Sequence, residues 1–157
     1  MLLRTIDQVC VVVNDIQKAV QQYWNIFGIG PFSIYTVAPP ELTDTTVHGK
    51  PEYYSMKLAF AKVGTVMLEL IQPLKGESVY KEFLVEKGEG IHHIATYEVD
   101  DLDSAIALLG KYGIGVLQSG RWQGASFAYM NTEKALGAII ELVKRTTGFP
   151  QPEATYP

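Results

Sequence analysis

Ile6-Asp7-Gln8-Val9 leads through a helix-like segment to Phe27-Gly28-Ile29-Gly30, and the pattern recurs as Ile91-His92-His93-Ile94 leading to Tyr112-Gly113-Ile114-Gly115. Each copy opens on an apolar, β-branched run and passes through a pair of Asn or Asp residues into an amphipathic segment. Each ends on an aromatic residue followed by Gly-Ile-Gly. A repeat of this length indicates one structural unit used twice, here a strand followed by a helix.

A second correspondence lies at the far end of each copy. Met67-Leu68-Glu69-Leu70-Ile71 resembles Ile139-Ile140-Glu141-Leu142-Val143. Each half therefore opens with a strand that carries a polar residue, Gln8 or His93, and closes with a strand that carries a glutamate. The first half is longer by about a dozen residues, and we place this excess in a Pro- and Thr-rich loop over 38–51.

Periodicity and capping residues fill in the remaining elements. Asn14 is the expected N-cap of a first helix that Gly28 closes. The predicted helices cover about 15–27, 78–86 and 101–112. The predicted strands cover about 5–13, 31–37, 54–62 and 65–72 in the first half, and 91–99, 114–119, 125–131 and 137–144 in the second.

These elements group into two tandem βαβββ modules, 5–75 and 91–145, with a connecting helix in 76–90 and a surface tail over 146–157. A module of this size cannot bury both faces of its sheet alone. We therefore predict an α+β fold in which 1–157 form one domain and the two modules share a concave metal-binding cleft.

The overall composition excludes several classes of protein. The chain has 157 residues, 47% hydrophobic and 19% charged, with a net charge of −4, which argues against a nucleic-acid partner. No apolar run approaches the ~18–20 residues of a membrane span. Cys10, the one cysteine, cannot form an internal disulfide and is predicted to be a core residue. With no signal-peptide pattern at the N-terminus, we expect a cytoplasmic protein without a membrane partner.

Four polar residues interrupt otherwise apolar rows of the predicted strands. A single strand glutamate usually faces solvent, and a single histidine is usually just hydrogen-bonded. Here the repeat puts the odd polar residue at matching positions in both halves. Buried carboxylates need a counter-charge, so the pattern favours one shared cation. The four are Gln8, Glu69, His93 and Glu141.

At these residues the chain resembles the vicinal oxygen chelate superfamily, from about Ile6 to Val143. Three segments look like the methylmalonyl-CoA epimerase branch: Val66–Leu74, Gly88–Ala95 and Gly137–Leu142. The resemblance implies four ligands for one divalent ion (Co, Ni, Zn, Mn or Mg): Gln8, Glu69, His93 and Glu141. We choose His93 of the histidine pair because it aligns with Gln8, while alternation places His92 on the opposite face.

The resemblance also implies a chemistry, which is proton removal from the carbon next to a metal-bound carbonyl. Glu141 is the first candidate base. By spacing within the epimerase branch, Glu52 is the candidate second acid/base. The substrate would then be an acyl-CoA.

Position 8 departs from the epimerases, which usually carry histidine there. A Gln/Glu/His/Glu set looks like that of glyoxalase I (lactoylglutathione lyase), whose substrate is a thiol adduct. Two further alternatives are a ring-cleaving dioxygenase, disfavoured because Gln8 removes one of its histidines, and a non-enzymatic resistance module. Exposed strand edges and the habit of the superfamily predict a homodimer.

Overall fold

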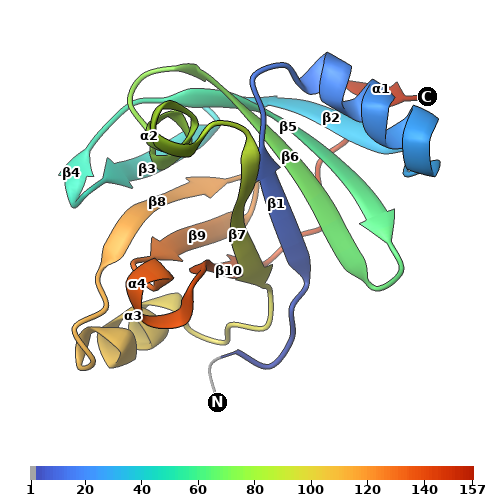
Figure 1. Cartoon of the computed structure of the whole chain (residues 1–157). Helices are drawn as coiled ribbons and strands as arrows, with labels where there is room; N and C mark the ends of the chain where they lie inside the picture. The colour runs from blue at the N-terminus through green and yellow to red at the C-terminus, as the bar shows by residue number, and fades with distance from the viewer. Residues whose placement is uncertain (1–2) are drawn as a thin grey trace.

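The computed structural model describes residues 3–157 (Figure 1). The helices are α1 (Ile16–Phe27), α2 (Val79–Lys87), α3 (Leu102–Gly110) and α4 (Glu133–Leu136). The strands are β1 (Gln8–Val12), β2 (Phe32–Val37), β3 (Leu42–Val47), β4 (Lys50–Pro51), β5 (Ser55–Val63), β6 (Val66–Lys75), β7 (Gly90–Thr96), β8 (Val116–Trp122), β9 (Ala125–Met130), β10 (Ile139–Arg145) and β11 (Ala154–Tyr156). Among the described helices, none is both long and apolar enough to cross a membrane.

All described strands belong to one sheet, in the order β11-β2-β5-β6-β1-β7-β10-β9-β8-β3-β4. The first module is β1-α1-β2-β5-β6 and the second is β7-α3-β8-β9-β10, which confirms the predicted α+β fold of paired βαβββ units. The modules meet where β1 runs antiparallel to β7, and these two strands lie side by side at the centre of Figure 1.

Three clusters of buried side chains hold the layers together. One lies between α1 and the first module's sheet, around Ile16 and Val20, and another lies between α3 and the second module's sheet, around Ala105. The largest fills the space between the two modules and includes Tyr54, Tyr80 and aromatic residues from both halves of the sheet. Helices α1 and α3 therefore cover the outer face of the sheet, and the inner faces of the two modules share one core.

The N-caps of three helices can be identified from their side-chain hydrogen bonds. The first helix is capped by the Asp15 side chain, which accepts a hydrogen bond from the backbone N of Lys18, so the expectation that Asn14 caps it was wrong. Gly28 closes it in the left-handed conformation, as predicted. Ser78 and Asp101 cap α2 and α3. The capping error moves that helix start by one residue only.

The segment 38–51 is not the loop that we expected. It contains β3 and β4, and β3 pairs with β8 of the other module. His48 and Gly49 both have positive φ, which makes a tight hairpin turn between Val47 and Lys50. Threonine and valine favour a strand once a partner is present, and that partner is distant in sequence.

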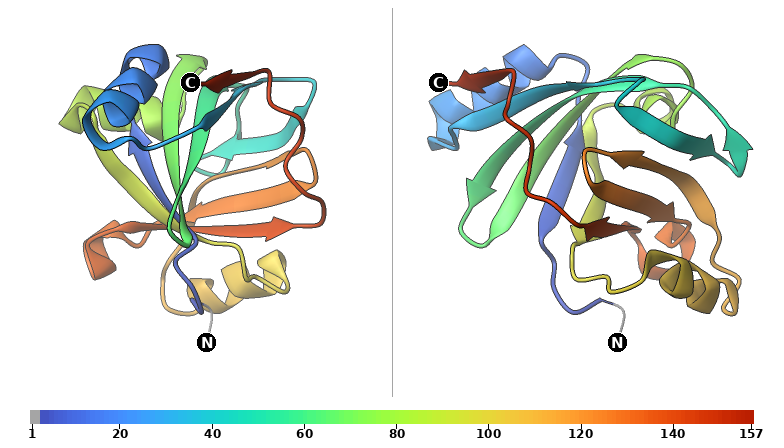
Figure 2. Two further views of the ribbon diagram at one scale, coloured as in Figure 1. Left: turned by 90° about the vertical axis from the view of Figure 1, so that its right-hand side faces the viewer. Right: turned by 180° about the vertical axis from the view of Figure 1, so that it is seen from behind.

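Most of the C-terminal tail is exposed, as expected of a surface segment, but the tail also pairs with the first module. Figure 2 shows it crossing from β10 of the second module to the edge of the first, where β11 pairs with β2. The Glu153 side chain accepts hydrogen bonds from the backbone N and hydroxyl of Thr36. Each module's edge strand, β2 or β8, is thus covered by a segment from the other module, so the edges on which we based the homodimer are paired within the chain.

Candidate metal centre

Each module places two of the predicted ligands by the same register rule. β1 and β6 are parallel with Gln8 opposite Met67, so Glu69 lies two residues further along. β7 and β10 are parallel with His93 opposite Ile139, so Glu141 also lies two residues further along. The internal repeat is therefore visible as geometry: one ligand on the first strand of a module and one on the last.

The structure brings all four predicted ligands to one place. Gln8 Nε2 lies 2.7 Å from Glu69 Oε2, 3.3 Å from His93 Nε2 and 3.4 Å from Glu141 Oε2. His93 Nε2 lies 3.3 Å from Glu69 Oε2 and 3.2 Å from Glu141 Oε2. All four are at most 6% exposed. Two carboxylates, an amide and an imidazole thus meet in the interior.

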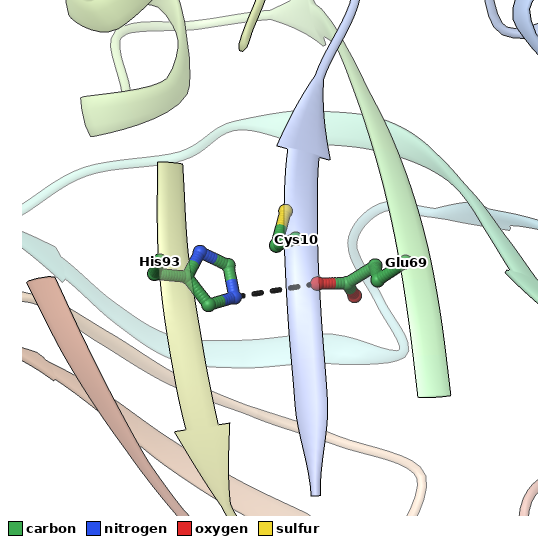
Figure 3. Close-up of side chains that lie close together, drawn as sticks. All are labelled: Cys10, Glu69 and His93. Atoms are coloured by element: carbon green, nitrogen blue, oxygen red, sulfur yellow. Dashed lines mark ion pairs between the residues drawn. The ribbon is translucent and has the colours of Figure 1, made fainter. Parts of the chain in front are cut away.

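Cys10 belongs to the same cluster. It lies between Glu69 and His93 in register, and the Cys10 Sγ, a Glu69 oxygen and a His93 nitrogen are within 4.8 Å of one another. Figure 3 shows the three projecting from β1, β6 and β7. Cys10 is fully buried, as predicted for a core residue. Burial and the neighbouring Glu69 raise the pKa of the Cys10 thiol, so the thiol stays protonated beside the carboxylates.

His92 corrects the simple alternation that we assumed. Against β1, Cys10 pairs with His93 and Val11 with Ile91, so His92 is the extra residue of a β-bulge. Both imidazoles are buried and pack on Tyr129, with the two Nδ1 atoms 2.8 Å apart. Ile91, which strict alternation would place on the same face as His93, is 67% exposed. The bulge turns two adjacent histidines into one bonded pair.

The charges of the cluster set which protons are present. Burial lowers the pKa of His93, but the charges and hydrogen bonds of Glu141 and Glu69 outweigh burial and raise that pKa to about 9. Burial raises the pKa of Glu69, and His93 partly offsets this. In the metal-free protein His93 therefore carries the proton that two buried carboxylates require.

His92 remains neutral beside it. Burial, with the charge of His93, lowers the pKa of His92 to about 3. A neutral ring bonded through Nδ1 to a protonated neighbour must accept there, so His93 Nδ1–H donates to His92 Nδ1. This fixes the His93 ring with Nε2 facing Gln8, Glu69 and Glu141. Partners of this kind commonly orient metal-bound imidazoles.

A cavity opens beside the cluster. Gln8, Glu69 and Glu141 form part of its wall, and most of the remaining lining is apolar or aromatic. Arg145 is the one cationic side chain among the described residues that line it. Its guanidinium lies 4.2 Å over the ring of Phe149 and donates to the backbone oxygens of Gln123 and Gly148. The cavity suits a small substrate with an anionic group.

Glu52, the other predicted catalytic residue, does not join the four. It follows β4, is half-buried, and its Oε1 accepts a hydrogen bond from the backbone N of Tyr53. Among residues 3–157 it is not one of those that line the cavity. Exposure alternates along this segment: Tyr53 is 78% exposed and Tyr54 2%. Glu52 lies between β4 and β5, next to the exposed Tyr53 and two residues before the buried Tyr54.

Sequence reasoning missed Tyr97. Its hydroxyl donates to Gln8 Oε1, its backbone N donates to Asp7 Oδ2 at 2.8 Å, and its ring lines the cavity. Alternation from His93 at i+4 places Tyr97 on the ligand face, but nothing in the sequence pairs it with Gln8 of the other module. Arg145 could have been found, since it follows Glu141 on the same strand face at i+4.

Fold and cluster together define a class of protein: paired βαβββ modules that enclose four potential metal donors beside a cavity. The sequence profile described as "Glyoxalase/Bleomycin resistance protein/Dioxygenase superfamily" matches residues 7–129. The chain belongs to this superfamily, as the resemblance implied. Glu141 lies beyond the matched range, so its assignment depends on the register and distances above.

Two individual proteins resemble this chain over most of its length. An uncharacterized Bacillus subtilis protein, YqjC, is 27% identical over 143 residues, covering 89% of this chain and 91% of its own. An ethylmalonyl-CoA/methylmalonyl-CoA epimerase of Cereibacter sphaeroides is 28% identical over 146 residues, covering 90% of this chain and 98% of its own. This chain is therefore similar to an epimerase and to a protein without a known activity.

Solved structures support the same fold. A hypothetical protein of Bacillus halodurans, BH1468, has a TM-score of 0.70 at 23% identity, covering 94% of this chain and 98% of that one. A Mycobacterium tuberculosis methylmalonyl-CoA epimerase has a TM-score of 0.65 at 23% identity, covering 93% and 91%. At these identities the likeness establishes the architecture.

Proposed function

We propose that this protein is a metal-dependent isomerase that moves a proton at the carbon next to a carbonyl, with a methylmalonyl-CoA-type thioester as substrate. The observation that carries the proposal is that Gln8, Glu69, His93 and Glu141, from matching register positions, converge on one point beside the cavity, and three of them line it. The similarity to epimerases supports the choice of substrate.

The four side chains fit a divalent cation. Two buried carboxylates leave negative charge in the interior, and in the metal-free protein the His93 proton and the Gln8 amide N–H groups offset part of it. Oxygen donors with one imidazole suit Mg²⁺, Mn²⁺, Co²⁺, Ni²⁺ or Zn²⁺. A bound ion would supply Lewis-acid polarisation of the carbonyl.

Glu141 is the proposed base. Its carboxylate both approaches His93 and lines the cavity, so it can reach a substrate α-carbon there. Inverting a carbon centre requires a proton to arrive on the opposite face. Glu52 is the proposed partner for that face because of its spacing within the epimerase resemblance, and its carboxylate would have to turn from the backbone N of Tyr53 toward the cavity. Proton transfer between positioned carboxylates and carbon is general acid–base catalysis.

Arg145 is the proposed contact for the anionic part of the substrate. Two of its contacts are backbone carbonyls, which leave other guanidinium N–H groups for a ligand. Glu141, Val143 and Arg145 share one face of β10, so base and cation border the same cavity.

The test of this function is solvent deuterium incorporation. Purified protein loaded with Co²⁺ should exchange the α-hydrogen of methylmalonyl-CoA in D₂O, and a chelator should stop the exchange. Exchange unaffected by a chelator would disprove the metal dependence. No exchange with any of the five divalent ions would disprove the epimerase assignment.

Glyoxalase I-like activity is the second candidate. The observation that favours it is the Gln/Glu/His/Glu donor set, which matches the glyoxalase I pattern more closely than the epimerase one. Turnover of a methylglyoxal–thiol adduct, together with no exchange of methylmalonyl-CoA, would select it. Both reactions draw on the same base and the same cluster.

A homodimer and a cytoplasmic location complete the proposal. Within residues 3–157 the modules' edge strands are already covered, so a second copy would dock on another surface. Light scattering on the eluting peak of a sizing column decides the oligomeric state, and a monomer mass at micromolar concentration would remove the dimer.

A further inference from the structure

The orientation of the Gln8 amide raises a problem for metal binding. Gln8 Nε2 is the end that points into the cluster, donating to Glu69 Oε2 and Glu141 Oε2, while Oε1 accepts from the Tyr97 hydroxyl. An amide NH₂ has no lone pair for a cation, so a ligand amide must present its oxygen. Gln8 has to reverse its two ends on going from the metal-free to the loaded protein.

Tyr97 is built to accept both orientations. A phenol hydroxyl can donate to Oε1 or accept from Nε2–H, whereas a carboxylate or an ammonium in its place could satisfy only one. Its backbone is fixed beside Gln8, because Tyr97 N donates to the side chain of Asp7 and Asp7 N donates to Ala95 O at 2.9 Å. When Tyr97 accepts from Gln8, its own proton turns into the cavity that it lines.

We propose that Tyr97 is a positioning residue that holds the Gln8 amide with its oxygen toward the metal in the loaded protein and with its nitrogen toward the carboxylates in the empty one. The inference rests on the proposed metal site. This role of Tyr97 explains how the Gln8 amide can be a metal ligand. An imidazole at the same position would not have to reverse its ends.

The first experiment compares Co²⁺ affinity by calorimetry in metal-free preparations of the native protein and of Tyr97→Phe, which removes the hydroxyl alone. Loss of a group that orients a ligand costs about 10- to 100-fold in metal affinity, and that loss is expected here. Tyr35→Phe is the matched control: it deletes a buried tyrosine hydroxyl that bonds Pro150 O, away from the cluster. It should bind Co²⁺ as the native protein does.

The second experiment separates positioning from packing. In Gln8→Glu the two ends of the side chain are equivalent, so no orientation remains to be held. Tyr97→Phe should then cost less affinity in the Gln8→Glu background than in the native one, by more than the roughly twofold margin within which independent substitutions add. The visible absorption of bound Co²⁺ should change when Tyr97→Phe is made in the native protein, and should stay the same when Tyr97→Phe is added to Gln8→Glu.

Two results overturn the inference while leaving the metal site intact: native Co²⁺ affinity in Tyr97→Phe, or an equal loss in both backgrounds. Absence of Co²⁺ binding by the native protein would overturn the metal site and this inference with it. Circular dichroism and thermal unfolding of the metal-free variants show whether each has kept its fold.

Discussion

In the first module Gln8 and Glu69 are offset by two residues across parallel strands, and in the second His93 and Glu141 repeat that offset. The modules differ in how the first ligand is held. His93 is bonded to its own neighbour, His92, through a local bulge. Gln8 is bonded to Tyr97, which belongs to the other module. One half therefore orients its ligand locally, while the other depends on docking of the two modules.

The largest expected effect is a difference in exchange rate between substitutions of the two glutamates, Glu141 and Glu69. Glu141→Gln removes the proposed base and a negative ligand together, whereas Glu69→Gln removes a ligand only. At saturating Co²⁺ the exchange rate of methylmalonyl-CoA should fall by about 10⁴-fold in Glu141→Gln, the upper end for a lost general base, and by clearly less in Glu69→Gln. Equal losses in the two variants would argue that Glu141 acts only as a ligand.

The next prediction concerns Glu52, which lies outside the repeat. If Glu141 and Glu52 act on opposite faces of the α-carbon, Glu52→Gln should lower epimerisation by about 10²- to 10³-fold. Deuterium should still enter the epimer whose C–H faces Glu141, with retention of configuration. Chiral analysis of the labelled thioester measures both. Glu41→Gln, an exposed carboxylate of the preceding segment, is the control, and unchanged epimerisation in Glu52→Gln would exclude the role.

Much of the site could be predicted because the repeat and strand alternation are local properties of sequence. They located Gln8, Glu69, His93 and Glu141 on matching strands, and the structure brings these four together. The errors arise where a residue's position depends on a distant partner. The β3–β4 hairpin exists because β8 offers an edge, and the bulge at His92 changes the alternation in one strand. Tyr97 contacts Gln8 from 89 positions away.

Gln8 and His93, the ligands on the first strand of each module, should differ in pH dependence, because only His93 carries a proton that it must lose to bind a metal. With its pKa raised to about 9 in the metal-free protein, His93 stabilises that form fully below the unfolded value of 6.5, and the stabilisation is lost as pH rises through 9. Co²⁺ must displace this proton, so affinity should rise about tenfold per pH unit between 7 and 8.5. Calorimetry in buffers of different ionisation enthalpy should find one proton released. A pH-independent affinity would contradict this.

The smallest expected effect comes from making the two modules alike. Gln8→His gives the first module the imidazole that the second already has, and an imidazole accepts a metal without the reversal that the amide requires. Co²⁺ affinity should stay within about tenfold of the native value, the lower limit for disturbing a ligand's surroundings.

Exchange of methylmalonyl-CoA should be retained in Gln8→His, and an increase would indicate that the amide tunes the site away from the epimerase reaction. The double variant with Tyr97→Phe sharpens the comparison, because an imidazole at position 8 no longer needs the tyrosine to choose between its two ends. Retained exchange in that double variant, beside a loss in Tyr97→Phe alone, would assign the difference between the modules to the amide. Loss of Co²⁺ binding in Gln8→His itself would instead mean that the space around position 8 fits an amide but not an imidazole.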